Sequence, residues 1–331
     1  MLQITSSQGS PLQQYDSPWS VALPIGAKRG HATLELSEAP IDGGELHDPF
    51  FADTLARLPL VQVARTEIPR AALRHIAPEH APAGLIFHVA RCGSTLLANL
   101  LRELPETVVY SEPPAFNDIL MPPFGNWSEQ EIVASLRLVA RGLSQAAGNQ
   151  PYIVKCRSWN TLFIRLLLKA FPSTPWVFLT RDPIEVAVSV MRKPPTWLRA
   201  HRLPANPFLP FLKVGSELVE QPERYLAEIL RAFTQAVADA DRSNGRLLTY
   251  TDLPGAAWKG ITAHFGFLPS AQVLEAMRRR AEVYSKDPSA RKPFNDDSAA
   301  KQAVATPELR RMIFDHATPS FLSLAESWND L

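Results

Sequence analysis

A short polar segment at residues 88–95, HVARCGST, combines the residue types that bind anions. It lies between the apolar run GLIFHV and the run GSTLLANLLREL, which has helical spacing. A turn from a strand into a helix points backbone N–H groups and the positive end of the helix dipole at a bound anion. Arg91 adds a cation, Gly93 permits close approach, and Ser94 and Thr95 add hydroxyl donors. The segment therefore predicts an anion-binding loop; the alternative is a glycine that only allows tight helix–strand packing.

This loop is not a Walker A motif. The GxxxxGK[ST] spacing is absent and no lysine precedes Ser94, whereas a nucleoside-triphosphate kinase places that lysine on the β- and γ-phosphates. A kinase with a degenerate loop and a catalytically silent nucleotide-binding module both stay open as alternatives.

A second anion-binding pattern follows at FLTRDP, residues 178–183. The apolar run delivers Arg181 at its carboxyl end, where ligands bind in open α/β sheets. Pro183 suits the first turn of a helix. Ser189, eight residues after Arg181 (189 − 181), lies about two helical turns further on. We expect Arg181 and Ser189 to bind one anion together; the alternative is that Asp182 caps the helix beside a surface arginine.

Together, RCGSTLL and FLTRDP with its serine resemble the 5′-phosphosulfate loop and the 3′-phosphate motif of sulfotransferases that use 3′-phosphoadenosine 5′-phosphosulfate (PAPS). Arginine stands in the loop where the cytosolic enzymes have lysine. Three further segments resemble the family: IVKCR at 153–157, LTYTDL at 248–253, and Arg291-Lys292. The resemblance covers about residues 84–295. It implies an α/β fold of the P-loop type and transfer of a sulfuryl group from PAPS to a hydroxyl or amine of a small-molecule acceptor, with release of PAP.

The resemblance also implies roles for individual residues. Arg91 and the amides of the loop would hold the 5′-phosphosulfate, the loop comprising Cys92, Gly93, Ser94 and Thr95. Lys155 would contact the bridging or sulfuryl oxygens, although a lysine at a strand end can also simply extend to solvent. The 3′-phosphate would contact Arg181, Ser189, Arg291 and Lys292, and Tyr250 would lie near the adenine. Two departures stand out: Thr251 replaces the usual glutamate, and the glycines of the late basic loop are missing.

The general base is less well marked. Cytosolic members have a histidine two residues after the strand-end lysine, but here that residue is Arg157, which cannot accept a proton. Other members use a glutamate after the second strand, and Glu112 directly follows TVVYS. Glu112 is therefore the predicted base and His88 the second candidate. The alternatives are an acid favoured by the next helix N-terminus and a histidine satisfied in the core.

The segment from about residue 285 to residue 298 carries prolines and charges and one large apolar side chain, Phe294. Because it can bury little surface to offset the entropy of ordering, we expect it to be mobile until a 3′-phosphate binds, and then to act as a lid.

The elements that must position these residues alternate along the chain. Apolar runs at 84–89, 107–111, 151–156, 175–181 and 245–250 are separated by stretches of helical spacing. This alternation predicts a parallel sheet with helices on both faces. Residues 1–80 are broken by prolines and predict a packed N-terminal extension of short strands and helices; residues 81–331 predict the α/β domain.

Composition limits the remaining classes. The chain has 331 residues, 46% apolar and 20% charged, with a net charge of +1, so we expect neither nucleic-acid binding nor a polybasic membrane anchor. No apolar run approaches the roughly 18 residues of a membrane span. Cys92 and Cys156 form no disulfide framework, and no residue cluster has metal-ligand spacing, so no metal is expected. The N-terminus lacks a signal-peptide pattern, and the expected location is the cytoplasm.

Overall fold

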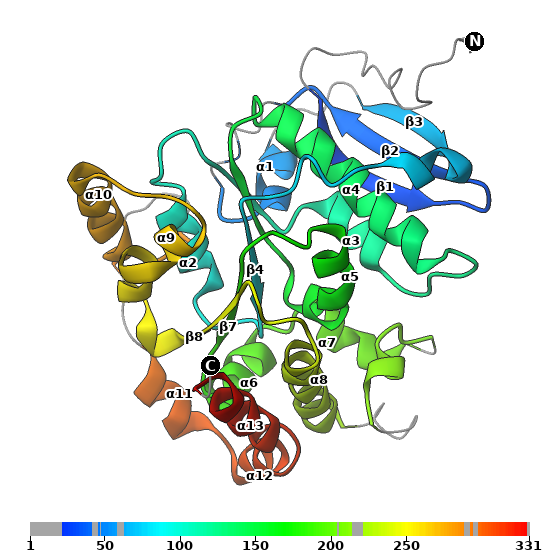
Figure 1. Ribbon diagram of the computed structural model, residues 1–331. Helices are drawn as coiled ribbons and strands as arrows, with labels where there is room; N and C mark the ends of the chain where they lie inside the picture. The colour runs from blue at the N-terminus through cyan, green and yellow to red at the C-terminus, as the bar shows by residue number, and fades with distance from the viewer. Residues whose placement is uncertain are drawn as a thin grey trace, which may run out of the picture.

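The centre of the protein is a five-stranded parallel sheet (Figure 1). The computed structural model describes residues 22–41, 46, 48–57, 63–203, 205–213, 221–287, 292–293 and 297–329. The strand order is β5-β6-β4-β7-β8, and every neighbouring pair is parallel. The strands are β4 (Gly84–His88), β5 (Val108–Ser111), β6 (Tyr152–Lys155), β7 (Trp176–Thr180) and β8 (Gly245–Thr249). All five coincide with predicted apolar runs.

Helices cover both faces of this sheet, which confirms the predicted α/β class. Figure 1 shows α2 (Ser94–Leu101), α9 (Thr262–His264) and α10 (Ala271–Ala281) on one side, and α5 (Ile164–Ala170) and α8 (Pro222–Ala238) on the other. Residues 160–171 (NTLFIRLLLKAF) have helical spacing, but Ser158–Phe163 form a 3₁₀ helix and the α-helix begins only at Ile164. There the Asn160 side chain accepts the Arg157 N–H at 2.7 Å, which favours a tight turn.

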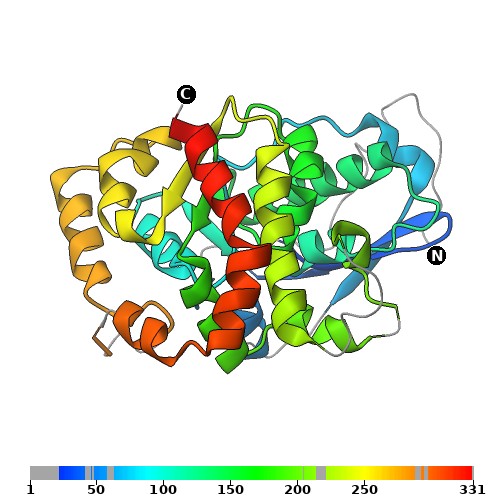
Figure 2. The same cartoon turned by 90° about the horizontal axis from the view of Figure 1, so that it is seen from below.

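Helices α12 (Pro307–His316) and α13 (Thr318–Asn329), near the C-terminus, pack along α8, as Figure 2 shows from below. The Thr234 hydroxyl on α8 donates to the Ser320 hydroxyl on α13 at 2.7 Å. Before them, α6 (Pro183–Arg192) and α11 (Ser298–Val304) lie next to the end of β7. Asp182 caps α6 by accepting the N–H groups of Ile184 and Glu185. The C-terminal helices thus support the helix that follows the second anion-binding pattern.

The described part of the N-terminal extension is a three-stranded antiparallel sheet in the order β1-β2-β3. Its elements are β1 (Leu23–Arg29), β2 (Thr33–Ala39), α1 (Phe51–Arg57), β3 (Ala64–Pro69) and the 3₁₀ helix Arg70–His75. The prediction missed β1, where Pro24 and Gly26 interrupt the strand pattern and the register shifts. The run LVQVAR at 60–65 predicts a strand, and the observed strand begins at Ala64; residues 60–62 lie outside the described residues.

This small sheet is joined to the main domain by polar contacts with α3 (Pro114–Leu120), α4 (Glu129–Ala146) and the loop between them. Arg70 binds the Glu131 carboxylate through two hydrogen bonds, of 2.6 and 2.8 Å. The Trp127 indole donates to the Gly30 carbonyl at 2.8 Å. Glu131 also completes a capping box with Ser128, so one carboxylate both begins α4 and binds the N-terminal sheet.

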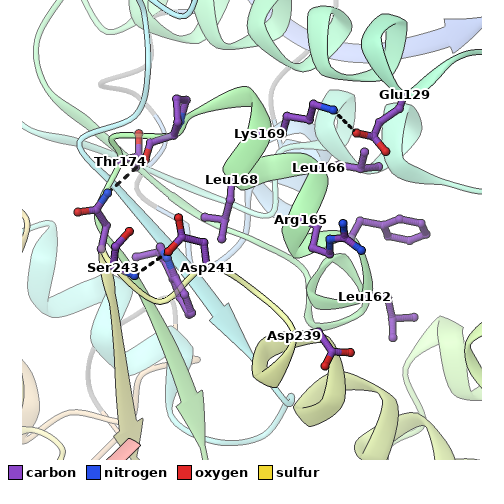
Figure 3. Close-up of a pocket in the computed structure, with 14 residues that line it drawn as sticks. Glu129, Leu162, Arg165, Leu166, Leu168, Lys169, Thr174, Asp239, Asp241 and Ser243 are labelled. Carbon is purple, nitrogen blue, oxygen red and sulfur yellow. Dashed lines mark hydrogen bonds and ion pairs between the residues drawn. The ribbon is translucent and has the colours of Figure 1, made fainter. Parts of the chain in front are cut away.

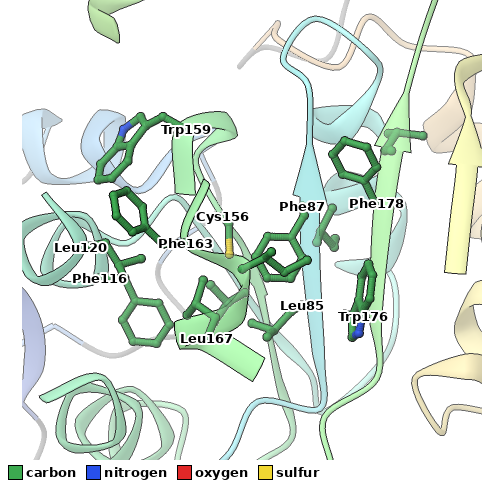
Figure 4. Packing of buried hydrophobic residues seen from close by; sticks show 14 of the residues in the cluster. Leu85, Phe87, Phe116, Leu120, Cys156, Trp159, Phe163, Leu167, Trp176 and Phe178 are labelled. Carbon is green, nitrogen blue, oxygen red and sulfur yellow. The ribbon is translucent and has the colours of Figure 1, made fainter. Parts of the chain in front are cut away.

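The core lies between the parallel sheet and its helices (Figure 4). Phe87 on β4 and Trp176 on β7 are almost completely buried and pack edge to face, with ring centroids 6.0 Å apart. None of the described helices is long and apolar enough to cross a membrane.

We expect Phe87→Ala to lower the free energy of unfolding by about 3–5 kcal/mol, because it leaves a cavity in the central strand. The exposed Phe314, 68% accessible on α12, provides the control, and Phe314→Ala should change stability by less than about 0.5 kcal/mol. Urea denaturation measures the free energy of unfolding of both variants. Equal losses in the two variants would contradict a central role for Phe87 in core packing.

Candidate active site

The loop between β4 and α2 has an unusual backbone. Ala90, Arg91 and Gly93 have φ angles of +75°, +52° and +90°. Non-glycine residues avoid this left-handed region, so the first two angles indicate a local strain of about 1–3 kcal/mol each. At Gly93 a Cβ would lie 2.9 Å from Leu253 Cδ1, so a side chain does not fit. The strained turn brings the backbone up to the first residues of α2.

A cavity of about 130 Å³ lies over this turn, and we call it the loop cavity. It brings both predicted anion-binding patterns together. The predicted residues that line it are Arg91, Cys92, Gly93, Ser94, Thr95, Arg181, Ser189 and Tyr250. The loop supplies one wall, while the end of β7 and helix α6 supply another. One anionic ligand can therefore contact both patterns.

Arg181 is the most heavily engaged of these residues. Its Nε donates to Glu185 at 2.6 Å, and Nη2 donates to Asp297 at 2.9 Å and to the Ser298 hydroxyl at 3.0 Å. The guanidinium carbon lies 3.9 Å from the centroid of the Tyr250 ring, a cation–π contact. Tyr250 thus lies beneath Arg181 and beside Gly93; its predicted proximity to an adenine stays a prediction.

Glu112 lines a second cavity of about 330 Å³, which we call the carboxylate cavity. Its φ is +64°, and its N–H donates to the Lys155 carbonyl at 2.7 Å. Its Oε1 accepts from Lys155 Nζ at 2.6 Å, and Oε2 lies 3.3 Å from Arg157 Nε. Burial alone would raise the pKa of this carboxyl, but the charge and the hydrogen bond of Lys155, with a smaller contribution from Arg157, outweigh burial and hold the pKa below its usual value. Glu112 is therefore ionised at neutral pH.

Lys155 lies behind Glu112, with a fully buried side chain. It is not among the described residues that line either cavity. Its ammonium also lies 4.9 Å from the centroid of the Phe50 ring. In this structure Lys155 holds the carboxylate in place, and its predicted contact with sulfuryl oxygens stays a prediction.

His88, the second candidate for the base, lines the carboxylate cavity but uses both ring nitrogens. Nδ1 accepts the Ala90 N–H at 3.1 Å, which leaves Nε2 to donate to the Cys156 carbonyl at 2.9 Å. Burial, followed by the charge of Lys155, lowers the pKa of His88 to about 3. A neutral ring with both nitrogens engaged is poorly placed to take a proton from a ligand.

Arg91 and Lys286 line both cavities, together with Ser94 and Thr95. The Arg91 guanidinium donates to the Lys193 carbonyl at 2.9 Å. Burial, followed by the charges of Arg91 and Lys155, lowers the pKa of Lys286 to about 8. The sequence suggested no site role for Lys286; its only signal was its position in the predicted lid.

The late basic segment is described only in part. Arg291 lies outside the described residues, as do seven of the 14 positions of the predicted lid (288–291 and 294–296), so both predictions stay untested. Lys292 is exposed, its carbonyl accepts the Tyr284 N–H at 2.7 Å, and its ammonium lies 5.4 Å from the Tyr284 ring centroid. Tyr284 lines the loop cavity, whereas Lys292 is not among the lining residues.

One proline-rich segment, KPPTWL at 193–198, lines the carboxylate cavity with Lys193, Pro195, Thr196 and Trp197. Trp159 lines the same cavity. The MPPFGNW segment lies instead beside β1 and lines a different cavity. Cys92 and Cys156 are buried, as expected, and burial raises the pKa of both thiols. No cluster of His, Cys, Asp and Glu that could hold a metal ion occurs among the described residues.

Another cavity, of about 410 Å³, lies at the opposite end of the sheet (Figure 3). Among its charged residues, Lys169 pairs with Glu129 at 2.5 Å, and Asp241 accepts the Ser243 N–H at 3.0 Å. It lies where β7 and β8 begin, whereas ligands of open α/β sheets bind where the strands end. The loop and carboxylate cavities, at the carboxyl edge, therefore form the candidate active site.

The chain is similar in fold to several solved sulfotransferases. The sulfotransferase domain from the curacin biosynthetic pathway is 14% identical, with a TM-score of 0.42, over 71% of this chain and 96% of that domain. A mouse sulfotransferase complexed with PAP is 12% identical, with a TM-score of 0.42, over 74% and 86% of the two chains. A Mycobacterium tuberculosis sulfotransferase is 16% identical, with a TM-score of 0.39, over 74% and 80%. No protein-family profile and no curated protein sequence matches the chain.

The lowered pKa of Lys286 predicts a pH-dependent stability. In the folded protein the pKa is about 8, against roughly 10.4 in the unfolded chain, so the unfolded state binds more protons between these values and stability rises with pH. Lys286→Gln should therefore stabilise the protein at about pH 7, and this gain should shrink by about pH 9.5. Urea denaturation at the two pH values measures it. The exposed Lys259→Gln is the control, and parallel pH profiles for Lys286→Gln and the parent would contradict the assignment.

Proposed function

We propose that this protein is a sulfotransferase that transfers a sulfuryl group from PAPS to a hydroxyl or amine of a small-molecule acceptor and releases PAP. The observation that carries the proposal is the junction of the two cavities. The loop cavity offers two separate cationic walls for a ligand with phosphate groups at both ends, and the carboxylate cavity presents an ionised acid. Arg91 and Lys286 lie at the boundary between them.

In the proposed reaction the acceptor lies in the carboxylate cavity and its oxygen or nitrogen attacks the sulfur of PAPS. A new bond to sulfur forms as the bond from sulfur to the bridging oxygen breaks, and PAP leaves with that electron pair. Glu112 takes the acceptor proton. Arg91, Lys286 and the loop amides stabilise the charge that gathers on the sulfuryl and bridging oxygens, so positioning and electrostatics supply most of the catalysis.

The Lys155–Glu112 pair adds a constraint to this mechanism. While Lys155 Nζ lies 2.6 Å from the carboxylate, Glu112 is held ionised but is a weak base. If PAPS draws the ammonium toward the sulfuryl oxygens, the pKa of Glu112 rises and its basicity increases when the acceptor must lose its proton. In this mechanism Lys155 pairs with Glu112 before PAPS binds and contacts the sulfuryl oxygens once PAPS is bound.

Recognition of the 3′-phosphate is the first test of this function. Because Arg181 and Ser189 line the loop cavity on a wall separate from the loop, a 3′-phosphate bound there should make PAP bind about tenfold or more tightly than AMP or ADP. Isothermal titration calorimetry measures the three affinities. Equal affinities would remove the assignment of the loop cavity to PAPS.

The role of Glu112 is the second test. Once an acceptor screen with PAPS, read by mass for an added sulfuryl group, has identified a substrate, Glu112→Gln should lower turnover about 10²–10⁴-fold. PAP binding should be retained, because Glu112 does not line the loop cavity. The exposed Glu67→Gln, on β3, is the matched control. Near-normal turnover in Glu112→Gln would contradict this role and leave His88 or water as the general base.

A further inference from the structure

The loop cavity contains a cation that neither sequence pattern indicated. Lys301, on α11, lines the cavity together with Arg181 and Ser189, although it comes 120 residues after Arg181 in the chain (301 − 181). Its side chain is only 6% exposed, and that of Arg181 is 5% exposed. Two buried cations thus face one small cavity at the carboxyl end of β7.

Both cations share one carboxylate oxygen. Asp297 Oδ1 lies 2.9 Å from Arg181 Nη2 and 2.8 Å from Lys301 Nζ. Glu185 binds the other side of the Arg181 guanidinium at 2.6 Å. These four side chains carry two positive and two negative charges, so the cluster is neutral without a ligand.

The two acids, Glu185 and Asp297, differ in how easily they can move away from the cations. The Glu185 side chain is 11% exposed, whereas that of Asp297 is 54% exposed. Asp297 also begins α11 without its side chain capping the N–H groups of that helix. Its carboxylate can therefore move into water when another anion takes its place against the two cations, which are fixed by burial.

The difference in exposure between Glu185 and Asp297 determines how the proposed ligand can bind. A 3′-phosphate in the loop cavity would bring up to two negative charges against a cluster that is already neutral. With Asp297 in place, the phosphate and the carboxylate would repel each other; with Asp297 turned away, the phosphate meets two buried cations that lack one counter-ion.

We propose, on the basis of the proposed function, that Asp297 occupies the position of the 3′-phosphate in the free protein, and that Arg181 and Lys301 together bind that phosphate once it displaces Asp297. Lys301 is then a specificity-determining residue for nucleotides phosphorylated at the 3′ position. Asp297 keeps the two cations paired while the site is empty of nucleotide, and it lowers the affinity for the nucleotide by competing with it.

The lowered pKa of Asp297 agrees with this competition at neutral pH. Partial burial raises the pKa of the carboxyl, but the hydrogen bonds from Lys301 and then Arg181 outweigh burial and hold it below the usual range. Asp297 is therefore an anion throughout the pH range in which a phosphate monoester is mostly dianionic.

The test compares PAP with 5′-AMP, which lacks only the 3′-phosphate, by isothermal titration calorimetry on the full-length protein. Asp297→Asn should bind PAP about tenfold more tightly than the parent, because the competing charge is gone, and should bind 5′-AMP unchanged. Lys301→Gln should bind PAP about tenfold or more weakly, again without a change for 5′-AMP. Opposite signs at two residues in direct contact are the expected signature, because a purely structural ion pair would weaken PAP binding in both variants.

Two control variants carry the same charge changes elsewhere. Asp315→Asn is exposed on α12, and Lys169→Gln lies at the opposite end of the sheet, so neither should alter the ratio of the PAP and 5′-AMP affinities. Unchanged or weaker PAP binding in Asp297→Asn would overturn the displacement, and unchanged PAP binding in Lys301→Gln would overturn the role of that lysine. A parent protein that does not bind PAP would contradict the proposed function itself. A parent that binds PAP, with variants that do not show the expected changes, would contradict only the roles of Asp297 and Lys301.

Discussion

The ion pair between Lys155 and Glu112 is the interaction on which the candidate site depends. The Lys155 side chain is fully buried at the end of β6, and a buried ammonium without a partner would cost the fold about 3–5 kcal/mol. The pair, together with the bond from the Glu112 N–H to the Lys155 carbonyl, turns the chain sharply after β5. The left-handed backbone of Glu112, a strain of about 1–3 kcal/mol, is tolerated because both contacts require it. A strained acid is thereby presented to a cavity.

The same edge of the sheet explains why so many cations meet there. In a parallel sheet all carboxyl ends lie together, so the residues that follow β4, β6 and β7 converge: Arg91, Lys155 and Arg181. The chain as a whole has a net charge of only +1, and each buried cation must therefore find a local anion. Glu112 pairs with Lys155, while Glu185 and Asp297 pair with Arg181. Lys155 and Arg181 are thus paired with acids, and a bound anion can enter by replacing one of these acids or by binding at Arg91 and Lys286, which line both cavities.

Several features of this protein follow from the sequence alone, because they depend on neighbours within a few residues. Apolar runs of five to seven residues marked all five strands of the parallel sheet. Pro183, which suits the first turn of a helix, marked the start of α6. The two anion-binding patterns were recognisable because a strand that ends in a polar turn before a helix is a local arrangement, and the parallel sheet then had to bring them to one edge.

Only the tertiary structure decided how the charges pair. Nothing near Lys155 in the sequence indicates that it is buried behind a carboxylate 43 residues earlier. The cavities identified Lys286, Asp297 and Lys301 as site residues, although no motif in the sequence had indicated them. The sequence analysis also missed the 3₁₀ helix Ser158–Phe163 and the bulged strand β1. The Asn160 side chain in the first case and Pro24 in the second override the local spacing. The physical reason is common to the charged residues. The state of a charge is set by desolvation and by partners that are distant in the chain, and both exist only once the fold has brought those segments together.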